Sequence, residues 1–200
     1  MDLPELIDIE QTADGWIKKY VLTYKLPNGL THTYDVASRK SLDAYRAELE
    51  ANAAGLAPTS ADAVSIVGRT PDDKLVLIKE FRFPLNSWCI AFPAGLVEPG
   101  EDLTACADRE MREETGYGIR PGTQVQPMAQ AGYSSTGLTD ETVQIIFADV
   151  EKAGDAEPEP TELIEPFELA IEGVASFLDT NTVPIGTRCQ LVLEAFARRH

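Results

Sequence analysis

Three glutamates are crowded into the stretch REMREETG at residues 109–116: Glu110, Glu113 and Glu114. Residues three and four apart on a helix lie on one face, so a helix here would place the three carboxylates side by side. Like charges at this spacing repel, and Gly116 is a typical helix end, where the helix dipole also disfavours negative charge. A bound divalent cation would remove the repulsion, and Mg²⁺ or Mn²⁺ prefers such oxygen ligands. The alternative is a solvated acidic face on an acidic protein.

The residues before this cluster predict the apolar side of the same helix, which we expect over residues 103–115. Glu110 and Glu114 continue the apolar stripe, where a purely structural helix would carry Leu or Ala. Arg109 lies four residues before Glu113 and is expected to hold one carboxylate, but it cannot neutralise all three. The stripe consists of Leu103, Cys106, Ala107 and Met111.

The rest of the chain predicts an α/β protein. Two strands flank the Pro-Asn-Gly turn at 27–29, and a helix or a long helical loop follows from Ser41, a possible N-cap, to Gly55. The polar segment 151–162 reads as an exposed, mobile loop. We expect two parts, an N-terminal β-hairpin module at 1–58 and an α/β body at 59–200. Further strands are expected at 61–70, 74–83, 142–150 and 163–171, and further helices at 172–181 and 186–200.

Composition limits the classes of partner. The chain has 200 residues and a net charge of −16, which argues against nucleic acid or an anionic membrane as a partner. The three cysteines lack metal-site spacing and suggest free thiols in a reducing compartment. The N-terminus lacks a signal region, and no apolar run approaches the ~20 residues of a membrane span. We therefore expect a cytoplasmic protein.

The spacing around the acidic helix resembles the Nudix box, G-x5-E-x7-R-E-U-x-E-E-x-G-U, in which U is aliphatic. Tyr117 departs from the last aliphatic position, which we interpret as a packing variation. The resemblance implies a Nudix-type α/β/α sandwich with a mixed sheet, and hydrolysis of a nucleoside diphosphate linked to a second group with Mg²⁺ or Mn²⁺. The matching residues are Gly95, Glu101, Arg109, Glu110, Met111, Glu113, Glu114 and Gly116.

The same resemblance assigns roles within the box. Glu110 and Glu114 would be direct metal ligands, and Glu113 a further ligand or an outer partner. The Ala94 carbonyl in the loop PAG would be another ligand. Glu101 and Arg109 would orient the helix.

Two stretches beyond the box, KEFRFPLNSWCIAFPAGLVEPGE and GYSSTGLTDE, resemble the ADP-ribose pyrophosphatase branch of the family. In that branch a small N-terminal β module exchanges across a homodimer and completes the partner's substrate pocket. Trp16 and Tyr34 would then sandwich adenine, with sheet packing as the alternative for both. Arg82 would bind the diphosphate, with a surface ion pair as the alternative. The remaining expected substrate contacts are Asp35, Arg39 and the loop at Gly137.

The water-activating carboxylate is expected in the loop GDAEPEPTELIE. Glu162 matches best, with Glu159 and Glu165 as close rivals, and Glu113 of the box is the alternative. Glu141 is a second-rank candidate for a substrate or metal contact.

The sequence thus predicts a cytoplasmic, homodimeric hydrolase that cleaves ADP-ribose to AMP and ribose 5-phosphate. Two departures from the branch, Ala91 in place of Glu and Thr136 in place of Pro, leave open another nucleotide sugar, such as UDP-glucose or GDP-mannose. A sensor that binds ADP-ribose without cleaving it is a further alternative. Intact box carboxylates argue against the sensor.

Overall fold

The computed structural model describes residues 3–56 and 60–198 and separates into two compact units. The first unit comprises Met1–Asp62 and Ala131–Val143, and the second comprises Ala63–Gln130 and Gln144–His200. The predicted boundary between residues 58 and 59 falls outside the described residues. The segment Ala131–Val143, which we had expected within the body, is part of the first unit.

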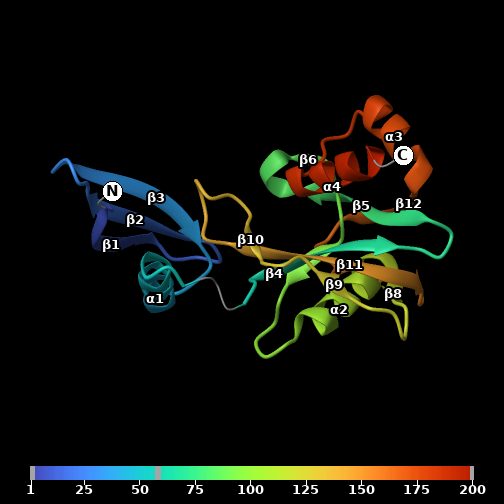
Figure 1. Cartoon of the computed structure of the whole chain (residues 1–200), viewed down its shortest axis with the longest axis horizontal. Coiled ribbons are helices and arrows are strands. Elements are labelled where there is room, and N and C mark those ends of the chain that lie inside the picture. Colours follow the sequence, from blue (N-terminus) through green and yellow to red (C-terminus); the bar gives the residue numbers. More distant parts are fainter. Residues whose placement is uncertain (1–2, 57–59, 199–200) are drawn as a thin grey trace. The chain divides into compact units, whose positions relative to one another are not determined.

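The first unit is an antiparallel sheet in the order β1-β2-β3 with one helix, α1 (Figure 1). The predicted hairpin is confirmed, and Gly29 adopts a positive φ of 85° in its turn. The predicted helix is also confirmed, because the Ser41 side chain accepts a hydrogen bond from Ala44 N at its start. The strand β1 was not predicted. The elements are β1 Glu5–Ala13, β2 Lys18–Lys25, β3 Thr31–Ser38 and α1 Leu42–Ala53.

The second unit is built on a sheet whose central path is β11-β4-β5-β12. The strands β4 and β11 run in the same direction and β5 runs against them, so the sheet is mixed (Figure 1). The short strand β10, Gly132–Tyr133, pairs with the start of β11 in the first unit. The strands are β4 Ala63–Arg69, β5 Lys74–Arg82, β6 Ser87–Ala91, β7 Ala94–Leu96, β8 Tyr117–Ile119, β9 Gln126–Pro127, β11 Thr142–Lys152 and β12 Ile164–Ala170.

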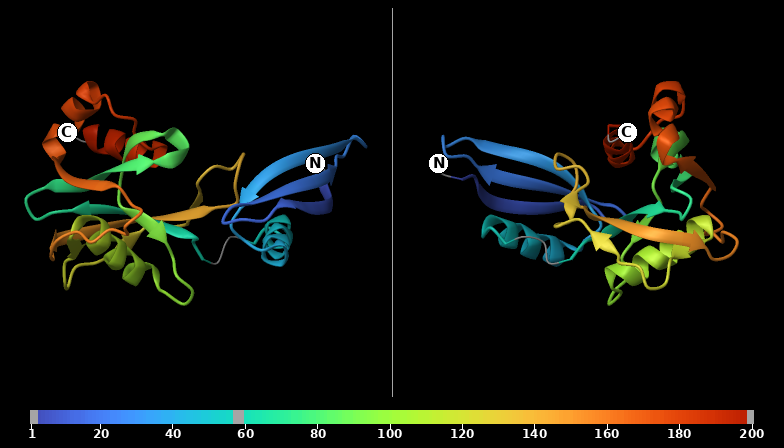
Figure 2. Two further views of the ribbon diagram at one scale, coloured as in Figure 1. Left: turned by 180° about the vertical axis from the view of Figure 1, so that it is seen from behind. Right: turned by 45° about the vertical axis from the view of Figure 1, so that its right-hand side comes forward.

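Helices cover both faces of this sheet, which confirms the predicted α/β/α sandwich (Figure 2). The side chains of β5 alternate between two core clusters, one on each face of the sheet. Val76 packs toward α2, whereas Leu75 and Leu77 pack toward α3 and α4. None of the helices in the described part of the chain is long and apolar enough to cross a membrane. The helices are α2 Leu103–Thr115, α3 Val174–Thr180 and α4 Thr187–Ala197, with 3₁₀ turns η1 Phe83–Leu85 and η2 Ile171–Gly173.

The helix α2 has the predicted bounds. Asp102 caps its start by accepting hydrogen bonds from the backbone N–H groups of Thr104 and Ala105. Gly116 ends it with a left-handed φ of 70°, and its N–H donates to Arg112 O. The predicted apolar stripe is confirmed, because Cys106, Ala107 and Met111 are buried and Leu103 packs beside them.

Gly116 also supports the segment after β11, so we predict that it tolerates no side chain. A Cβ there would lie 2.4 Å from Gly154 O, in addition to the strain of a positive φ. We expect Gly116→Ala to lower the free energy of unfolding in urea by roughly 3 kcal/mol, because overlap adds to backbone strain.

Gly122 provides the matched control. It has a φ of +79° but no atom within 4 Å of its would-be Cβ. Gly122→Ala therefore isolates the strain and should cost only about 1 kcal/mol. Equal losses in the two variants would contradict the close approach at Gly116.

Candidate active site

The last turns of α2 carry the three box carboxylates at different depths. Glu114 is 4% exposed, and the side chain of Glu110 is 12% exposed. The side chain of Glu113 is 47% exposed. Glu110 and Glu114 therefore continue the buried stripe, as the spacing predicts, and the reading of a fully solvated acidic face is wrong for these two residues.

The strand β7 packs directly against the two inner carboxylates. Ala94 N donates a hydrogen bond to Glu114 Oε2 at 3.1 Å. A Cβ on Gly95 would lie 1.8 Å from Glu110 Oε1, so glycine leaves room for the carboxylate in the position that it occupies here. Pairing of Gly95 with Val64 on β4 fixes this strand in the sheet. The glycine of the motif thus forms a cradle for the glutamate fifteen residues later.

Arg109 links the helix to the loop before it. Its Nε and Nη2 atoms donate to the two oxygens of Glu101, each at 3.0 Å. Its Nη1 donates to Glu110 at 2.7 Å and to Glu113 at 3.2 Å. Arg109 therefore holds two of the three box carboxylates, where we had expected one. Glu114 is not among its partners.

Burial dominates the electrostatics of the inner pair. Burial, opposed by the hydrogen bond from Ala94 N and helped by nearby carboxylates such as Glu110, raises the pKa of Glu114 to about 9. Burial also raises the pKa of Glu110, while Arg109 opposes that change. By contrast, hydrogen bonds from Arg109 lower the pKa of Glu101 to about 2. Glu114 is thus the acid whose ionised form most needs a positive partner.

The donor set of this corner fits a hard divalent cation. Carboxylate oxygens are the ligands that Mg²⁺ and Mn²⁺ prefer, and a buried carboxylate needs a compensating charge. Over residues 3–56 and 60–198, no three acid, cysteine or histidine side chains already surround a common metal position. Arg109 instead draws Glu110 and Glu113 together, and Ala94 N satisfies one oxygen of Glu114.

Glu162 is the loop acid that lies near this corner. Its charge contributes to the raised pKa values of Glu110 and Glu114. Its Oε2 accepts a hydrogen bond from Glu159 N at 3.0 Å, which closes a tight turn in the loop. Glu165 pairs instead with Lys79 at 2.9 Å. Lys79 and Glu80 are adjacent on β5, so their side chains point to opposite faces of the sheet, and Glu165 lies with Lys79 on the face opposite to Glu80.

Arg82 and Glu80 form an ion pair at the end of β5, with 2.9 Å between Arg82 Nη1 and Glu80 Oε1. The alternative that we kept for Arg82, an ion pair, is therefore present in the structure. Burial raises the pKa of Glu80, Arg82 lowers it, and Glu162 raises it again. Sequence reasoning missed Glu80. The sequence pattern that could have identified Glu80 is the alternation Val76, Ile78, Glu80. Side chains two apart on a strand share a face, so this pattern places an acid on the face that α2 covers.

The expected base and ribose contacts lie in the first unit. Tyr34 OH donates to Gly137 O at 3.0 Å, so these two are brought together. Asp35 pairs with Lys19 at 3.1 Å. Arg39 forms an ion pair with Glu141. Each of these side chains thus has a partner within its own unit.

Trp16 and Tyr34 do not meet within this unit. Trp16 is exposed in the turn before β2, whose first residue is Lys18, whereas Tyr34 pairs with Leu22. The four residues from Lys18 to Leu22 span about 13 Å of strand, so the backbones of Trp16 and Tyr34 are well separated along the sheet. Thr136 lies near Tyr34, since both line a cavity of about 690 Å³ beneath the sheet.

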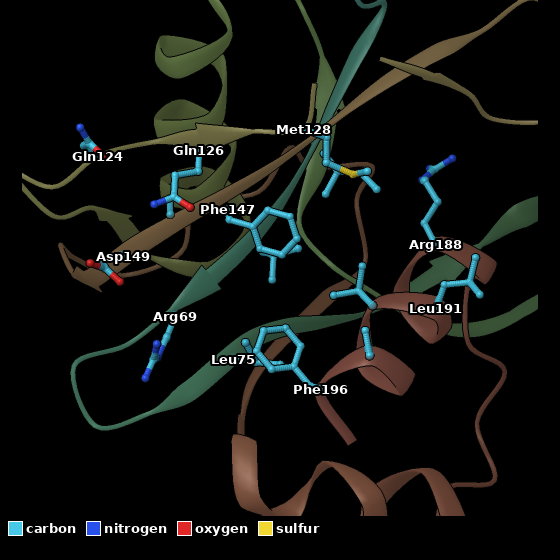
Figure 3. A pocket seen from close by; sticks show the side chains of 15 residues that line it. Arg69, Leu75, Gln124, Gln126, Met128, Phe147, Asp149, Arg188, Leu191 and Phe196 are labelled. Carbon is cyan, nitrogen blue, oxygen red and sulfur yellow. The ribbon is translucent and has the colours of Figure 1, made fainter. Parts of the chain in front are cut away.

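A second cavity, of about 620 Å³, lies in the second unit between the sheet and α4 (Figure 3). Leu75, Phe147 and Phe196 line its centre, with Arg188 at one end and Arg69 at the other. Leu75 packs on the face of the sheet away from α2. This apolar cavity is therefore separate from the acidic corner at the end of α2.

Comparison with known proteins agrees with this geometry. The NUDIX domain matches residues 59–181. An ADP-sugar pyrophosphatase from Mus musculus is 32% identical over 161 residues, which cover 76% of this chain and 64% of that protein. An ADP-ribose pyrophosphatase from Bacillus subtilis (strain 168) is 31% identical over 123 residues, or 60% of this chain and 64% of that protein.

Among solved structures, the chain resembles one described as the crystal structure of ADP compounds hydrolase. The TM-score is 0.73, the sequences are 20% identical, and the match covers 100% of this chain and 94% of the other. This likeness confirms the fold. The chain spans about 64% of the length of the mouse and Bacillus relatives. The matched domain, together with the glycine cradle and buried glutamates of its motif, shows that the chain belongs to the Nudix family.

Proposed function

We propose that this chain is a metal-dependent pyrophosphohydrolase that cleaves ADP-ribose to AMP and ribose 5-phosphate. One observation carries the proposal, namely that the buried Glu114 and the mostly buried Glu110 lie against β7 at the end of the Nudix helix. The names of the relatives, ADP-sugar pyrophosphatase and ADP-ribose pyrophosphatase, support ADP-ribose as the substrate.

Nudix hydrolases generally need a divalent metal ion. We infer Mg²⁺, with Mn²⁺ as a substitute, held by Glu110, Glu114, the more exposed Glu113 and the Ala94 carbonyl. Such an ion would neutralise diphosphate charge and lower the pKa of a bound water. Arg109 would remain bound to Glu101 and keep the helix oriented as the other carboxylates turn to the ion.

We assign Glu162 as the base that accepts a proton from the attacking water, because its charge acts on both inner glutamates. Its loop is tied to the Nudix helix, since Glu157 N donates to Glu113 O at 2.8 Å. Glu113 is the alternative base. Arg82 would bind the diphosphate through its guanidinium fork.

We further propose a cytoplasmic homodimer in which the N-terminal unit completes the partner's substrate pocket. The exposure of Trp16 and its backbone separation from Tyr34 along the sheet support this, because a base can stack between rings that come from two copies. Asp35, Arg39 and Gly137 would then contact the base and ribose.

Removal of the charge at Glu114 tests the metal site. In the folded protein the pKa of Glu114 is raised from 4.5 to about 9, so this side chain stays protonated at pH values where it would ionise in the unfolded chain. Without metal, stability from this group therefore falls as pH rises between those values, by at most about 1.4 kcal/mol per pH unit. We expect thermal melts in EDTA to show this decline for the wild type and a weaker one for Glu114→Gln.

Added Mg²⁺ should raise the melting temperature of the wild type at pH 8, since binding to the folded state stabilises it. It should have little effect on Glu114→Gln. Glu113→Gln is the control, because its more exposed carboxylate should leave the decline with pH intact. Identical pH slopes and identical Mg²⁺ responses in wild type and Glu114→Gln would remove the proposed metal site.

A substrate panel tests the reaction. We expect Mg²⁺-dependent release of AMP from ADP-ribose, with much lower kcat/KM for UDP-glucose and GDP-mannose. Glu162→Gln should reduce kcat by roughly 10²-fold or more, as for loss of a general base. Glu159→Gln, three residues away, should stay near wild type.

Preference for UDP-glucose or GDP-mannose would support metal-dependent diphosphate hydrolysis but contradict ADP-ribose as the substrate. A melting shift with ADP-ribose and no product would instead favour a sensor. Glu159→Gln that is as inactive as Glu162→Gln would contradict the assignment of the base.

Mixing two inactive variants tests the shared pocket. In a heterodimer of Trp16→Ala with Glu114→Gln, exchange of the N-terminal units would place both substitutions in one site and leave the other site intact. Random reassociation of equal amounts makes about half of the dimers mixed, so activity should recover to about a quarter of wild type. No recovery, or a monomer by light scattering, would contradict the exchange.

A further inference from the structure

Glu80 is a mostly buried carboxylate to which the proposed reaction gives no role. Its side chain is 14% exposed and pairs with the half-exposed Arg82 at 2.9 Å. Both residues lie on the same face of β5, because they are two apart. Val76 on that face packs in the core beneath α2, so the pair continues the face that the Nudix helix covers.

The backbone of Glu80 is fixed on both sides, whereas that of Arg82 lies at the end of its strand. Glu80 pairs with Cys89 on β6 and with Ile164 on β12. Ile164 is the first residue of β12 to pair with β5, so Arg82 lies beyond the end of that pairing. Arg82 therefore pairs only on its other side, with Ser87 of β6. A fixed carboxylate thus anchors a longer and more exposed cation.

Arg82 stands in an acidic neighbourhood. The charges of Glu80 and Glu162 both act on Glu114, so three carboxylates lie within electrostatic range of one another. A flexible arginine here would be attracted to Glu114 or Glu162, the acids that the proposed function assigns to the metal and the water. Glu80 supplies the carboxylate that Arg82 contacts in this structure, at 2.9 Å.

We propose that Glu80 is a positioning residue that holds Arg82 on the active-site face of β5, aimed at the diphosphate of the substrate. This inference rests on the proposed function. The ion pair uses Nη1 of Arg82, and over the described residues no hydrogen bond engages Nε or Nη2. A guanidinium can hold a carboxylate by one side and phosphate oxygens by another, since it carries five donors in a planar fork.

Steady-state kinetics with ADP-ribose test the proposal on four variants: Glu80→Ala, Glu80→Gln, Arg82→Gln and the double variant Glu80→Ala/Arg82→Gln. We expect Glu80→Ala to raise KM roughly tenfold with kcat within about twofold, as for loss of one charge-assisted contact. Glu80→Gln keeps an oxygen acceptor for Arg82 and should recover most of the loss. In the Arg82→Gln background, Glu80→Ala should raise KM no further.

Glu165→Ala is the matched control. It breaks an ion pair of the same length, 2.9 Å to Lys79, on the neighbouring strand. Its side chain belongs to the opposite face, so KM should not change. Thermal melts of all variants separate a positioning effect from loss of folded protein.

Two results would overturn the inference. Additive effects of Glu80→Ala and Arg82→Gln on KM would show that Glu80 does not act through Arg82. A higher Mg²⁺ requirement in Glu80→Ala with unchanged KM would make Glu80 part of the metal site instead.

Failure of the proposed function gives a different result, because the wild type would then not hydrolyse ADP-ribose. The role of Glu80 is read independently from calorimetric binding of ADP with Ca²⁺ to the same proteins. The same non-additive pattern in Kd supports positioning. Additive effects, or no binding of ADP by the wild type, refute it.

Discussion

Two carboxylates largely removed from water at the end of a helix are the constraint on which this molecule depends. Placing Glu110 and Glu114 on the inward stripe of α2 removes them from water, which costs free energy unless charge or hydrogen bonds compensate. Gly95 makes room for one of them, and Ala94 N donates to the other. Arg109 then ties the outer part of the cluster to Glu101. Some residues of the Nudix motif thus serve to pack and hydrogen-bond its acidic side chains, whatever these side chains bind.

The helix was predictable in detail because its signals are local. The apolar stripe, the cap at Asp102 and the C-terminal glycine at Gly116 each act within a turn or two, and their agreement fixes both ends. The strand β1 was not predicted because it lacks a clear local signal. Ile9 is the one residue of this strand that is buried, so its sequence carries little of the alternation that identifies a strand.

Contacts distant in sequence were the part that the sequence did not predict. Tyr34 and Gly137 are 103 residues apart, yet they share a hydrogen bond in the first unit. Lys40 joins the two segments of that unit more firmly, since its ammonium group contacts Glu48, Asp62 and Asp140. No local pattern identifies such partners, because long lysine side chains are usually solvated. For this reason the sequence did not indicate that Ala131–Val143 groups with the N-terminal segment in one compact unit.

The distribution of arginines explains where a cation is needed. Arg109 compensates Glu101, Glu110 and Glu113, and Arg82 compensates Glu80. Over residues 3–56 and 60–198, no ion pair reaches Glu114 or Glu162, although their charges act on each other. Each arginine fork has a fixed geometry and a permanent charge, so it can organise the border of an acidic site without taking part in proton transfer. Glu114 keeps its proton for lack of a positive partner, so its ionised form needs a compensating charge, and this is the physical reason for the divalent ion that we propose near the Nudix helix and Glu162.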